Sequence, residues 1–248
     1  MVTRSIFVGL LLGLTVAPSL ASGNLLLNPS FEQGRTSWVS LVTPGKAFWH
    51  DFSIAPDPKE PAGHCVRLDL TSAEAKEKTG IWGMVQEVMA SGGIPRYLRG
   101  RYFVADWHRG IPRQYIQVVF NVWPTEKRNL TGEETSADAV PVQLAFVLAG
   151  ISKPPFKIDN RKFVFSGTDE PRTGEWIDFE FDLHTAFKEH WGSLPTKFDA
   201  FRVLCEARFD GRRETETVAR ATVYFDDMYL GDESKAGSSS IQATAAGK

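Results

Sequence analysis

Four stretches of this sequence alternate between apolar and polar side chains with a period of two residues. The clearest is 115–123, in which every second residue from Ile116 to Val122 is apolar. The other three stretches are 102–108, 176–183 and 201–207. Because successive side chains of a β-strand point to opposite faces of its sheet, this period predicts strands with one buried side.

Turn-forming pairs separate these stretches and several further runs rich in β-forming residues. Examples are Asn28-Pro29, Gly92-Gly93 and Asp210-Gly211. Short strands at such spacing are typical of a β-sandwich. Only 183–191, apolar at every fourth residue, predicts a helix, and there is no internal repeat. We therefore expect one all-β domain, an antiparallel β-sandwich with one short helix.

The first 23 residues have the pattern of a secretory signal peptide. Arg4 precedes an apolar run at 6–14, and small residues follow at 19–21. The run is shorter than the roughly 20 residues that a membrane span needs, so we expect cleavage, with an uncleaved anchor as the alternative. The expected product is extracellular or periplasmic, without a membrane span. Residues 24–232 are expected to form the domain, and 233–248 a disordered tail.

Charge and cysteine content narrow the partners further. The chain has 28 Lys and Arg against 30 Asp and Glu, a net charge of −2, so it lacks the basic excess of a nucleic-acid-binding protein. Cys65 and Cys205 are the only cysteines, and in an oxidising compartment they could pair. Cys65 is out of phase with the apolar residues of its strand, so two separate thiols are equally compatible. We expect a monomer.

The polar faces of the alternating strands carry an unusual set of side chains. They are Tyr115, Gln117, Asn121, Trp123, Asp106, His108, Arg202 and Glu206. Aromatic rings can stack on the C–H face of a pyranose, while amides, guanidinium groups and carboxylates hydrogen-bond its hydroxyls. The alternative is that long loops such as 126–139 cover these rings and form a satellite core.

Both ends of the expected domain have distinctive sequences. Residues 24–34 read Asn-Leu-Leu-Leu-Asn-Pro-Ser-Phe-Glu-Gln-Gly, and 221–230 contain Phe-Asp-Asp-Met. These two ends resemble the opening and closing strands of the jelly-roll carbohydrate-binding modules of the family 4, 9 and 22 type, within the galactose-binding-like fold. Residues 100–107 resemble the central strand of that family, and 174–181 resemble its Trp-led strand. The resemblance runs in order through nearly the whole chain after the signal peptide.

This resemblance implies a structural calcium ion and a place for the ligand. Glu32 and Asp226 would hold the calcium where the first and last strands meet, which suits an ion that prefers oxygen ligands. The alternative is that Glu32 is solvated and Asp226 accepts backbone N–H groups. The ligand cleft would lie on the concave sheet face, with Trp82 as its stacking ring. Other subfamilies bind at the loop rim, where the candidates are Phe48, Trp49 and His50.

Three alternatives to a non-catalytic sugar-binding protein remain. A polysaccharide lyase could use Arg202, Gln117, Tyr115 and His108 to neutralise a carboxylate and move the adjacent proton. A glycosidase would need two carboxylates on either side of the glycosidic bond that it cleaves. Asp106 and Glu206 could form this pair only if they share a face. A scaffold or adhesion protein would have no saccharide affinity. The sequence favours a secreted protein that binds poly- or oligosaccharide.

Overall fold

The computed structural model describes residues 23–73, 75–123, 142–196 and 198–235. The expected signal peptide, the loop 126–139 and most of the expected tail lie outside these residues. Within the described part, none of the helical structure is long and apolar enough to cross a membrane.

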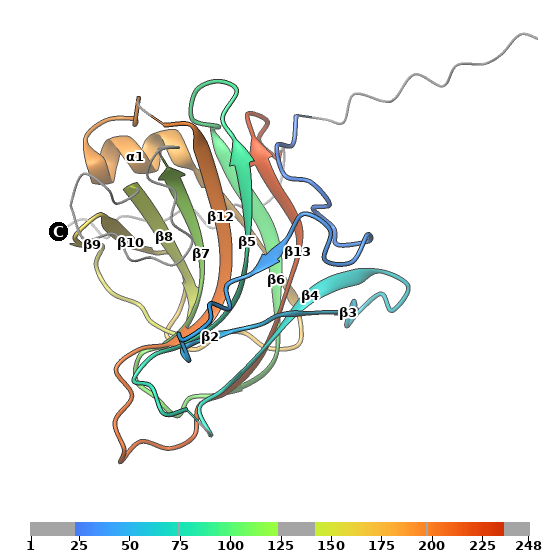
Figure 1. Ribbon diagram of the computed structural model, residues 1–248, viewed down its shortest axis with the longest axis vertical. Coiled ribbons are helices and arrows are strands. Elements are labelled where there is room, and N and C mark those ends of the chain that lie inside the picture. Colours follow the sequence, from blue (N-terminus) through green and yellow to red (C-terminus); the bar gives the residue numbers. More distant parts are fainter. Residues whose placement is uncertain (1–22, 74, 124–141, 197, 236–248) are drawn as a thin grey trace, which may run out of the picture.

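Two sheets pack face to face (Figure 1). The large sheet has the strand order β1-β5-β12-β7-β8-β10-β9, with β2 also paired to β5; the small sheet has the order β11-β6-β13-β4-β3. Strands of the large sheet are β1 (Val39–Ser40), β2 (Trp49–His50), β5 (Gly80–Met89), β7 (Gln114–Trp123), β8 (Val142–Ala149), β9 (Phe156–Ile158), β10 (Arg161–Phe165) and β12 (Ala200–Phe209). Strands of the small sheet are β3 (Ser53–Pro56), β4 (His64–Thr71), β6 (Tyr97–His108), β11 (Trp176–Asp182) and β13 (Arg220–Gly231). The expected all-β sandwich is confirmed, although β10 pairs with β8, and β2 with β5, in parallel.

The apolar faces predicted from the two-residue period form the core between the sheets. On β7 this face carries Ile116, Val118 and Phe120, each fully buried, and β12 adds Phe201 and Val203 from the same side. The small sheet supplies apolar side chains from β4, β6, β11 and β13 to the same cluster. The opposite side of β7, β12 and β8 therefore points away from the small sheet, and we call it the outer face of the large sheet.

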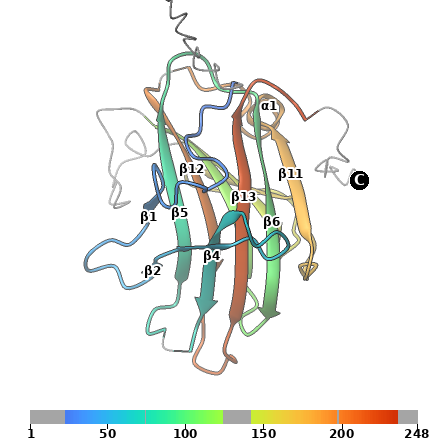
Figure 2. The same ribbon diagram turned by 90° about the vertical axis from the view of Figure 1, so that its right-hand side faces the viewer.

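The one α-helix among the described residues is α1 (Leu183–Trp191), with the bounds that the sequence predicts. The Asp182 side chain accepts the Thr185 backbone N–H and caps the first turn, and Gly192 ends the helix with a φ of 83°. Leu183 and Phe187 are buried against the sheets, so α1 covers one end of the sandwich (Figure 2).

The two ends of the domain lie side by side. The Leu25 backbone N–H donates to the Leu230 carbonyl at 2.7 Å, and the Asn24 amide donates to the Met228 carbonyl at 3.0 Å. The opening segment is a series of turns and bends up to residue 38, and not the regular strand that the resemblance implies. In Figure 2 the opening segment runs alongside β13 at the centre of the small sheet.

A change of register in β6 corrects one expectation of the sequence. Phe103 and Trp107, four residues apart, were expected to share the core face. In the structure Trp107 packs against the core, whereas Phe103 lies on the other side, against Trp176 and Tyr224. The pairing of β6 with β13 shifts by one residue between these positions, and such a slip reverses the face of every later side chain.

Both cysteines are buried free thiols. Cys65 lies on β4 in the small sheet, and its Sγ points at the carbonyls of Ala55 and Pro56. Cys205 lies on β12 in the large sheet, with its Sγ 4.0 Å from the Sδ of Met228. The two thiols are therefore separate, which was one of the two alternatives that the sequence left open.

Candidate functional site

The outer face of the large sheet brings together six of the residues expected to bind a ligand. Tyr115, Gln117, Asn121 and Trp123 project from β7, and Arg202 and Glu206 from β12. The register places Gln117 opposite Glu206 and Asn121 opposite Arg202. Side chains directly opposite each other on neighbouring strands are in contact range, so these polar groups form cross-strand pairs.

At one end of this face, the polar groups converge on Arg208. Its Nη1 donates to the Oε2 of Glu206 at 3.0 Å, and its Nη2 donates to the Oδ1 of Asp210 at 2.7 Å. Gln117 donates to the same Glu206 oxygen at 2.6 Å, and the Tyr115 hydroxyl donates to the Oδ2 of Asp210 at 2.6 Å. The result is a continuous buried network of charge-assisted hydrogen bonds.

The pKa values in this network follow from burial and charge. Burial raises the pKa of Tyr115, so its hydroxyl remains a proton donor. For Asp210, burial acts to raise the pKa, but Arg208 and the hydrogen bonds to the carboxylate hold it below its usual value. Burial acts to lower the pKa of Arg208, but the nearby Tyr115, Glu206 and Asp210 raise this pKa above its usual range. Asp210 and Arg208 therefore stay charged near neutral pH.

The other end of the face is built around Arg202. Its Nε donates to the Oε2 of Glu87 at 2.7 Å, and its guanidinium lies 3.8 Å from the centre of the Trp123 ring. This combination of ion pair and cation–π contact fixes the arginine side chain over the indole.

The outer face is closed along most of its length. All six expected residues on it are between 1% and 5% exposed, and Tyr115 and Val119 belong to a second apolar cluster with Phe163 of β10. The sequence expectation of a trough open to water along β7 is thus not met. Among the residues that the structure describes, four buried polar atoms on this face have no hydrogen-bond partner: Gln117 Oε1, Asn121 Oδ1, Trp123 Nε1 and Arg208 Nε. Buried polar atoms without partners are rare in folded proteins, and they often mark functional sites.

A cavity of about 370 Å³ opens at the Tyr115 end of the outer face. This volume is within the range of about 300–1,000 Å³ that is common for small-molecule sites. Tyr115, Arg208 and Asp210 line its inner side, and the loop residues Ile151 and Lys153 line another side. The cavity therefore joins the buried network to the end of the sheet where β5 and β7 begin and β8 and β12 end.

A wall of phenyl rings borders the same cavity. Phe156 of β9 stacks on Phe163 and Phe165 of β10, with ring centres 4.9 and 5.7 Å apart and planes within 30° of parallel. Phe156 is 37% exposed, and Ile158 beside it is 54% exposed. Because β9 is the last strand of the large sheet (Figure 1) and its apolar residues are exposed, this wall reaches the molecular surface.

Three other expected ligand-binding residues lie elsewhere. Trp82 points into the core between the sheets, is 6% exposed, and stacks on His50 with ring centres 4.0 Å apart. Asp106 and His108 lie at the exposed end of β6 in the small sheet. Trp82 pairs with Ala207 of β12, and Met84 pairs with Cys205. Both β12 residues lie in the core between the sheets, so Trp82 and Met84 point there as well. The glycines beside Trp82 therefore do not mark an exposed ring.

Neither set of expected catalytic groups is assembled. His108 is in a different sheet from Arg202, Gln117 and Tyr115, and the Tyr115 hydroxyl already donates its proton to Asp210. Asp106 and Glu206 are likewise on different sheets. Glu206 is instead paired with Arg208.

The expected calcium ligands have other partners. Both carboxylate oxygens of Glu32 are bound by His64, through its backbone N–H at 2.9 Å and its Nδ1 at 3.0 Å. Asp226 accepts from Nη2 of Arg101 at 2.5 Å, and the same nitrogen is 3.2 Å from Asp57. Among the described residues, no three His, Cys, Asp or Glu side chains gather in a way that could hold a metal ion. The donors as placed do not form a calcium shell, and an arginine already neutralises Asp226.

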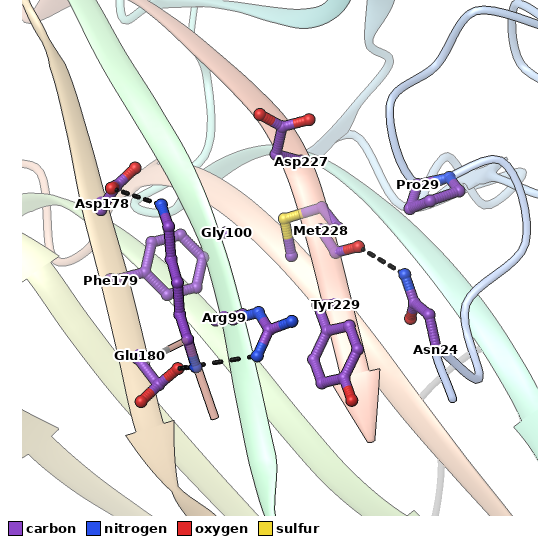
Figure 3. A pocket seen from close by; sticks show the side chains of 11 residues that line it. Asn24, Pro29, Arg99, Gly100, Asp178, Phe179, Glu180, Asp227, Met228 and Tyr229 are labelled. Carbon is purple, nitrogen blue, oxygen red and sulfur yellow. Dashed lines mark hydrogen bonds and ion pairs between the residues drawn. The ribbon is translucent and has the colours of Figure 1, made fainter. Parts of the chain in front are cut away.

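A second pocket, of about 340 Å³, lies on the small sheet (Figure 3). Asp178 and Glu180 of β11 face Arg99 of β6, and the Arg99 guanidinium lies 3.5 Å from the centre of the Tyr229 ring. Lys235, from the start of the expected tail, binds Asp178 with its Nζ and Glu180 with its backbone N–H, both at 2.8 Å. Among the described lining residues, Lys235 pairs with Asp178 and Arg99 with Glu180, so the charges that face this pocket already bind each other.

The sequence analysis did not identify several residues of the cavity. They are Arg113, Lys153, Phe156, Arg161, Phe163, Arg208 and Asp210. Arg208 continues the two-residue period of Arg202 and Glu206, and this signal could have identified it. The others come from separate turns and edge strands, whose proximity no local pattern encodes.

No family model matches this sequence. No curated protein matches it. Three solved structures are similar to it. The enzymatically active domain of tailspike protein 4 from bacteriophage CBA120 matches 84% of this chain at 7% identity, with a TM-score of 0.40. A non-crystalline cellulose-specific carbohydrate-binding module, CBM28, matches 84% at 11% identity with a TM-score of 0.42, and a surface glycan-binding protein from Prevotella bryantii matches 76% at 10% identity with a TM-score of 0.37. The matches cover 21%, 95% and 52% of those chains, so this chain spans about a fifth of the tailspike domain. Likenesses this distant identify neither a family nor a ligand.

Proposed function

We propose that this chain is a secreted, non-catalytic protein of the jelly-roll carbohydrate-binding type, and that it binds poly- or oligosaccharide in the cavity at the Tyr115 end of the outer face. The proposal moves the binding site from the middle of β7 to this end. Trp82, Asp106 and His108 have no part in it, because they lie in the core or in the other sheet.

One observation carries the proposal: an apolar ring wall and a buried polar network border the same cavity. The phenyl wall of Phe156, Phe163 and Phe165 offers a flat surface to the C–H face of a sugar ring. Opposite it, the oxygens of Tyr115 and Asp210 are held in fixed positions and can accept hydrogen bonds from hydroxyl groups. A ligand site usually combines such an apolar lining with a few fixed polar groups.

Replacing Phe156 by alanine tests this assignment. Phe156 is partly exposed and lies on an edge strand, so Phe156→Ala should change the melting temperature little. A ring contact worth about 1.5 kcal/mol corresponds to roughly a tenfold loss of affinity. The measurement is binding to a glycan array and retention on insoluble polysaccharides, compared with the wild type.

Met89→Ala, which also removes an exposed apolar side chain from the large sheet, is the matched control and should bind as the wild type does. A wild-type protein that binds no glycan on the array would refute the proposed function. Full affinity in Phe156→Ala would refute the placement of the site. Product absorbing in the ultraviolet, released from an acidic polysaccharide, would instead support the lyase alternative.

A further inference from the structure

Positive charge dominates the lining of the Tyr115-end cavity. Four cationic side chains line it, and Asp210 is the one carboxylate among the described lining residues. The four cations are Arg113, Lys153, Arg161 and Arg208. The second pocket, on the small sheet, has no such excess, since there Lys235 and Arg99 face three carboxylates.

The single carboxylate is already used. Asp210 accepts hydrogen bonds from Arg208, from the Tyr115 hydroxyl and from the Thr79 hydroxyl. Arg208 is paired with Glu206 as well as with Asp210. Within the described part of the chain, the ion pairs at this cavity are confined to these three residues, and the other three cations have no acidic partner.

Arg161 shows the imbalance most clearly, because its guanidinium is enclosed. Its Nε donates to an uncharged partner, the Oε1 of Gln143, at 2.8 Å, and its guanidinium lies 5.7 Å from the centre of the Phe163 ring. Burial, together with the nearby charge of Arg208, lowers the pKa of Arg161. Glu206 and Asp210 act on Arg161 only through space, and no described carboxylate forms an ion pair with it. An enclosed cation is stabilised by a direct ion pair, so an anion entering the cavity would be favoured here.

Arg208 adds a second, independent indication. It is 7% exposed and lines the cavity, and its Nε is buried without a hydrogen-bond partner although both terminal nitrogens are bound. Arginine presents its donors in a fixed planar fork that matches carboxylate and sulfate oxygens. The inner side of the cavity therefore holds a guanidinium that is fixed in place and contributes its positive charge to the cavity wall.

We propose that the cavity binds the acidic group of an anionic saccharide, a uronate carboxylate or a sulfate ester. Arg161 and Arg208 bind the acidic group, while the sugar ring lies against the phenyl wall of Phe156, Phe163 and Phe165. This inference rests on the proposed saccharide-binding function and adds the class of ligand. Arg113 and Lys153 are exposed, so they attract the ligand from solution and make its binding sensitive to salt.

Paired polysaccharides that differ only in charge test the ligand class. The probes are polygalacturonate with its carboxyl-reduced form, and carrageenan with its desulfated form, titrated against the full-length protein. We expect the charged member of at least one pair to bind ten times more tightly or better, and this preference to weaken with added salt. Whichever pair shows the preference distinguishes carboxylate from sulfate.

The variant Lys153→Gln tests the location. It should reduce affinity for the charged polysaccharide severalfold and reduce the salt dependence. Lys157→Gln makes the same change of charge on β9, but Lys157 alternates with Phe156 and Ile158 and does not line the cavity. Lys157→Gln should therefore bind as the wild type does. Both lysines are exposed, so neither variant should fail to fold.

The outcomes separate the two proposals. Equal binding to the charged and neutral members of both pairs, or binding confined to neutral glycans, overturns the anionic class and leaves saccharide binding in place. Equal loss in Lys153→Gln and Lys157→Gln, or no loss in either, overturns the location. No binding to any member or to the glycan array overturns the proposed function itself.

Discussion

At the scale of single residues, hydrogen-bond partners decide which charged groups are available to a ligand. Arg208 shows this, because it binds Glu206 and Asp210 together and leaves neither carboxylate free. Removing one member of such a buried network would strand its partner's charge, which commonly costs about 3–5 kcal/mol. The network therefore holds the inner side of the cavity, including the Arg208 guanidinium, in one arrangement.

His50 gives a prediction about pH. Its ring stacks on Trp82, and burial lowers the pKa of the imidazole. A base whose pKa is lowered by folding stabilises the protein above its unfolded pKa of about 6.5, and this contribution is lost as the pH falls. His50→Phe keeps a ring on Trp82 and removes the charge. We expect the melting temperature of the wild type, relative to that of His50→Phe, to fall by about 1–3 °C between pH 7.5 and pH 5.

The control for this experiment is His108→Phe, at an exposed position on β6. The difference in melting temperature between wild type and His108→Phe should not vary over the same pH range. If both substitutions change the pH dependence equally, the effect belongs to general acid destabilisation and the assignment to His50 is wrong.

At the scale of elements, the phase of each strand decides whether a ring is structural or free to bind. In β5, Trp82 lies in phase with the buried Met84, and a Cβ added to Gly80 would lie 2.6 Å from the ring of Phe209. Gly80 therefore accommodates neighbouring rings within the core, and not a ligand outside it. By the same reasoning Phe156 and Phe163 are available to the proposed ligand site, because they lie on the outer face, on the edge strand β9 and its neighbour β10.

Trp82→Ala tests this reading of β5. A buried tryptophan replaced by alanine commonly lowers the free energy of unfolding by about 3–5 kcal/mol, and each kcal/mol shifts the melting temperature by roughly 2–4 °C in a domain of this size. We expect a loss of stability within this range by urea denaturation. Saccharide affinity, measured where the variant is fully folded, should be unchanged. Unchanged stability together with lost binding would restore Trp82 as the stacking ring that the sequence suggests.

At the scale of the whole molecule, the two ends of the domain are joined, and an arginine holds the carboxylates at the junction. Asn24 bonds to β13, and nearby Arg101 of β6 contacts three carboxylates: Asp57, Asp226 and Asp227. Burial raises the pKa of Asp226 to about 6, against the opposing effect of Arg101. Arg101 therefore places a positive charge beside Asp226, one of the two residues that the family resemblance assigns to calcium.

Chelation and substitution together test this junction. We expect EDTA to leave the melting temperature of the wild type unchanged, and Arg101→Gln to lower the free energy of unfolding by about 3 kcal/mol, since it leaves Asp57 and Asp226 without a counter-ion. A melting temperature that falls with EDTA in the wild type, but not in Asp226→Ala, would support the calcium ion that the sequence predicts.

Local patterns were sufficient to predict much of the fold. The two-residue period located β7, β11 and β12 to within one or two residues, because alternation is a direct consequence of burying one side of a strand. The four-residue spacing of Leu183, Phe187 and Trp191 predicted α1, and the structure adds the Asp182 cap and the terminal Gly192. Six of the nine expected ligand-binding residues share one face for the same reason, since they lie in phase on two strands that are neighbours.

The sequence by itself determined the strands, the helix and the set of polar side chains on β7 and β12, because these depend on neighbours in the chain. Only the tertiary structure decided that β6 joins the other sheet, that Trp82 faces inward, and that the polar face is closed except at one end. The cavity itself joins Arg113, Lys153, Arg161 and Arg208, which are far apart in sequence. Their unbalanced charge is a property of position in space, and no local pattern contains it.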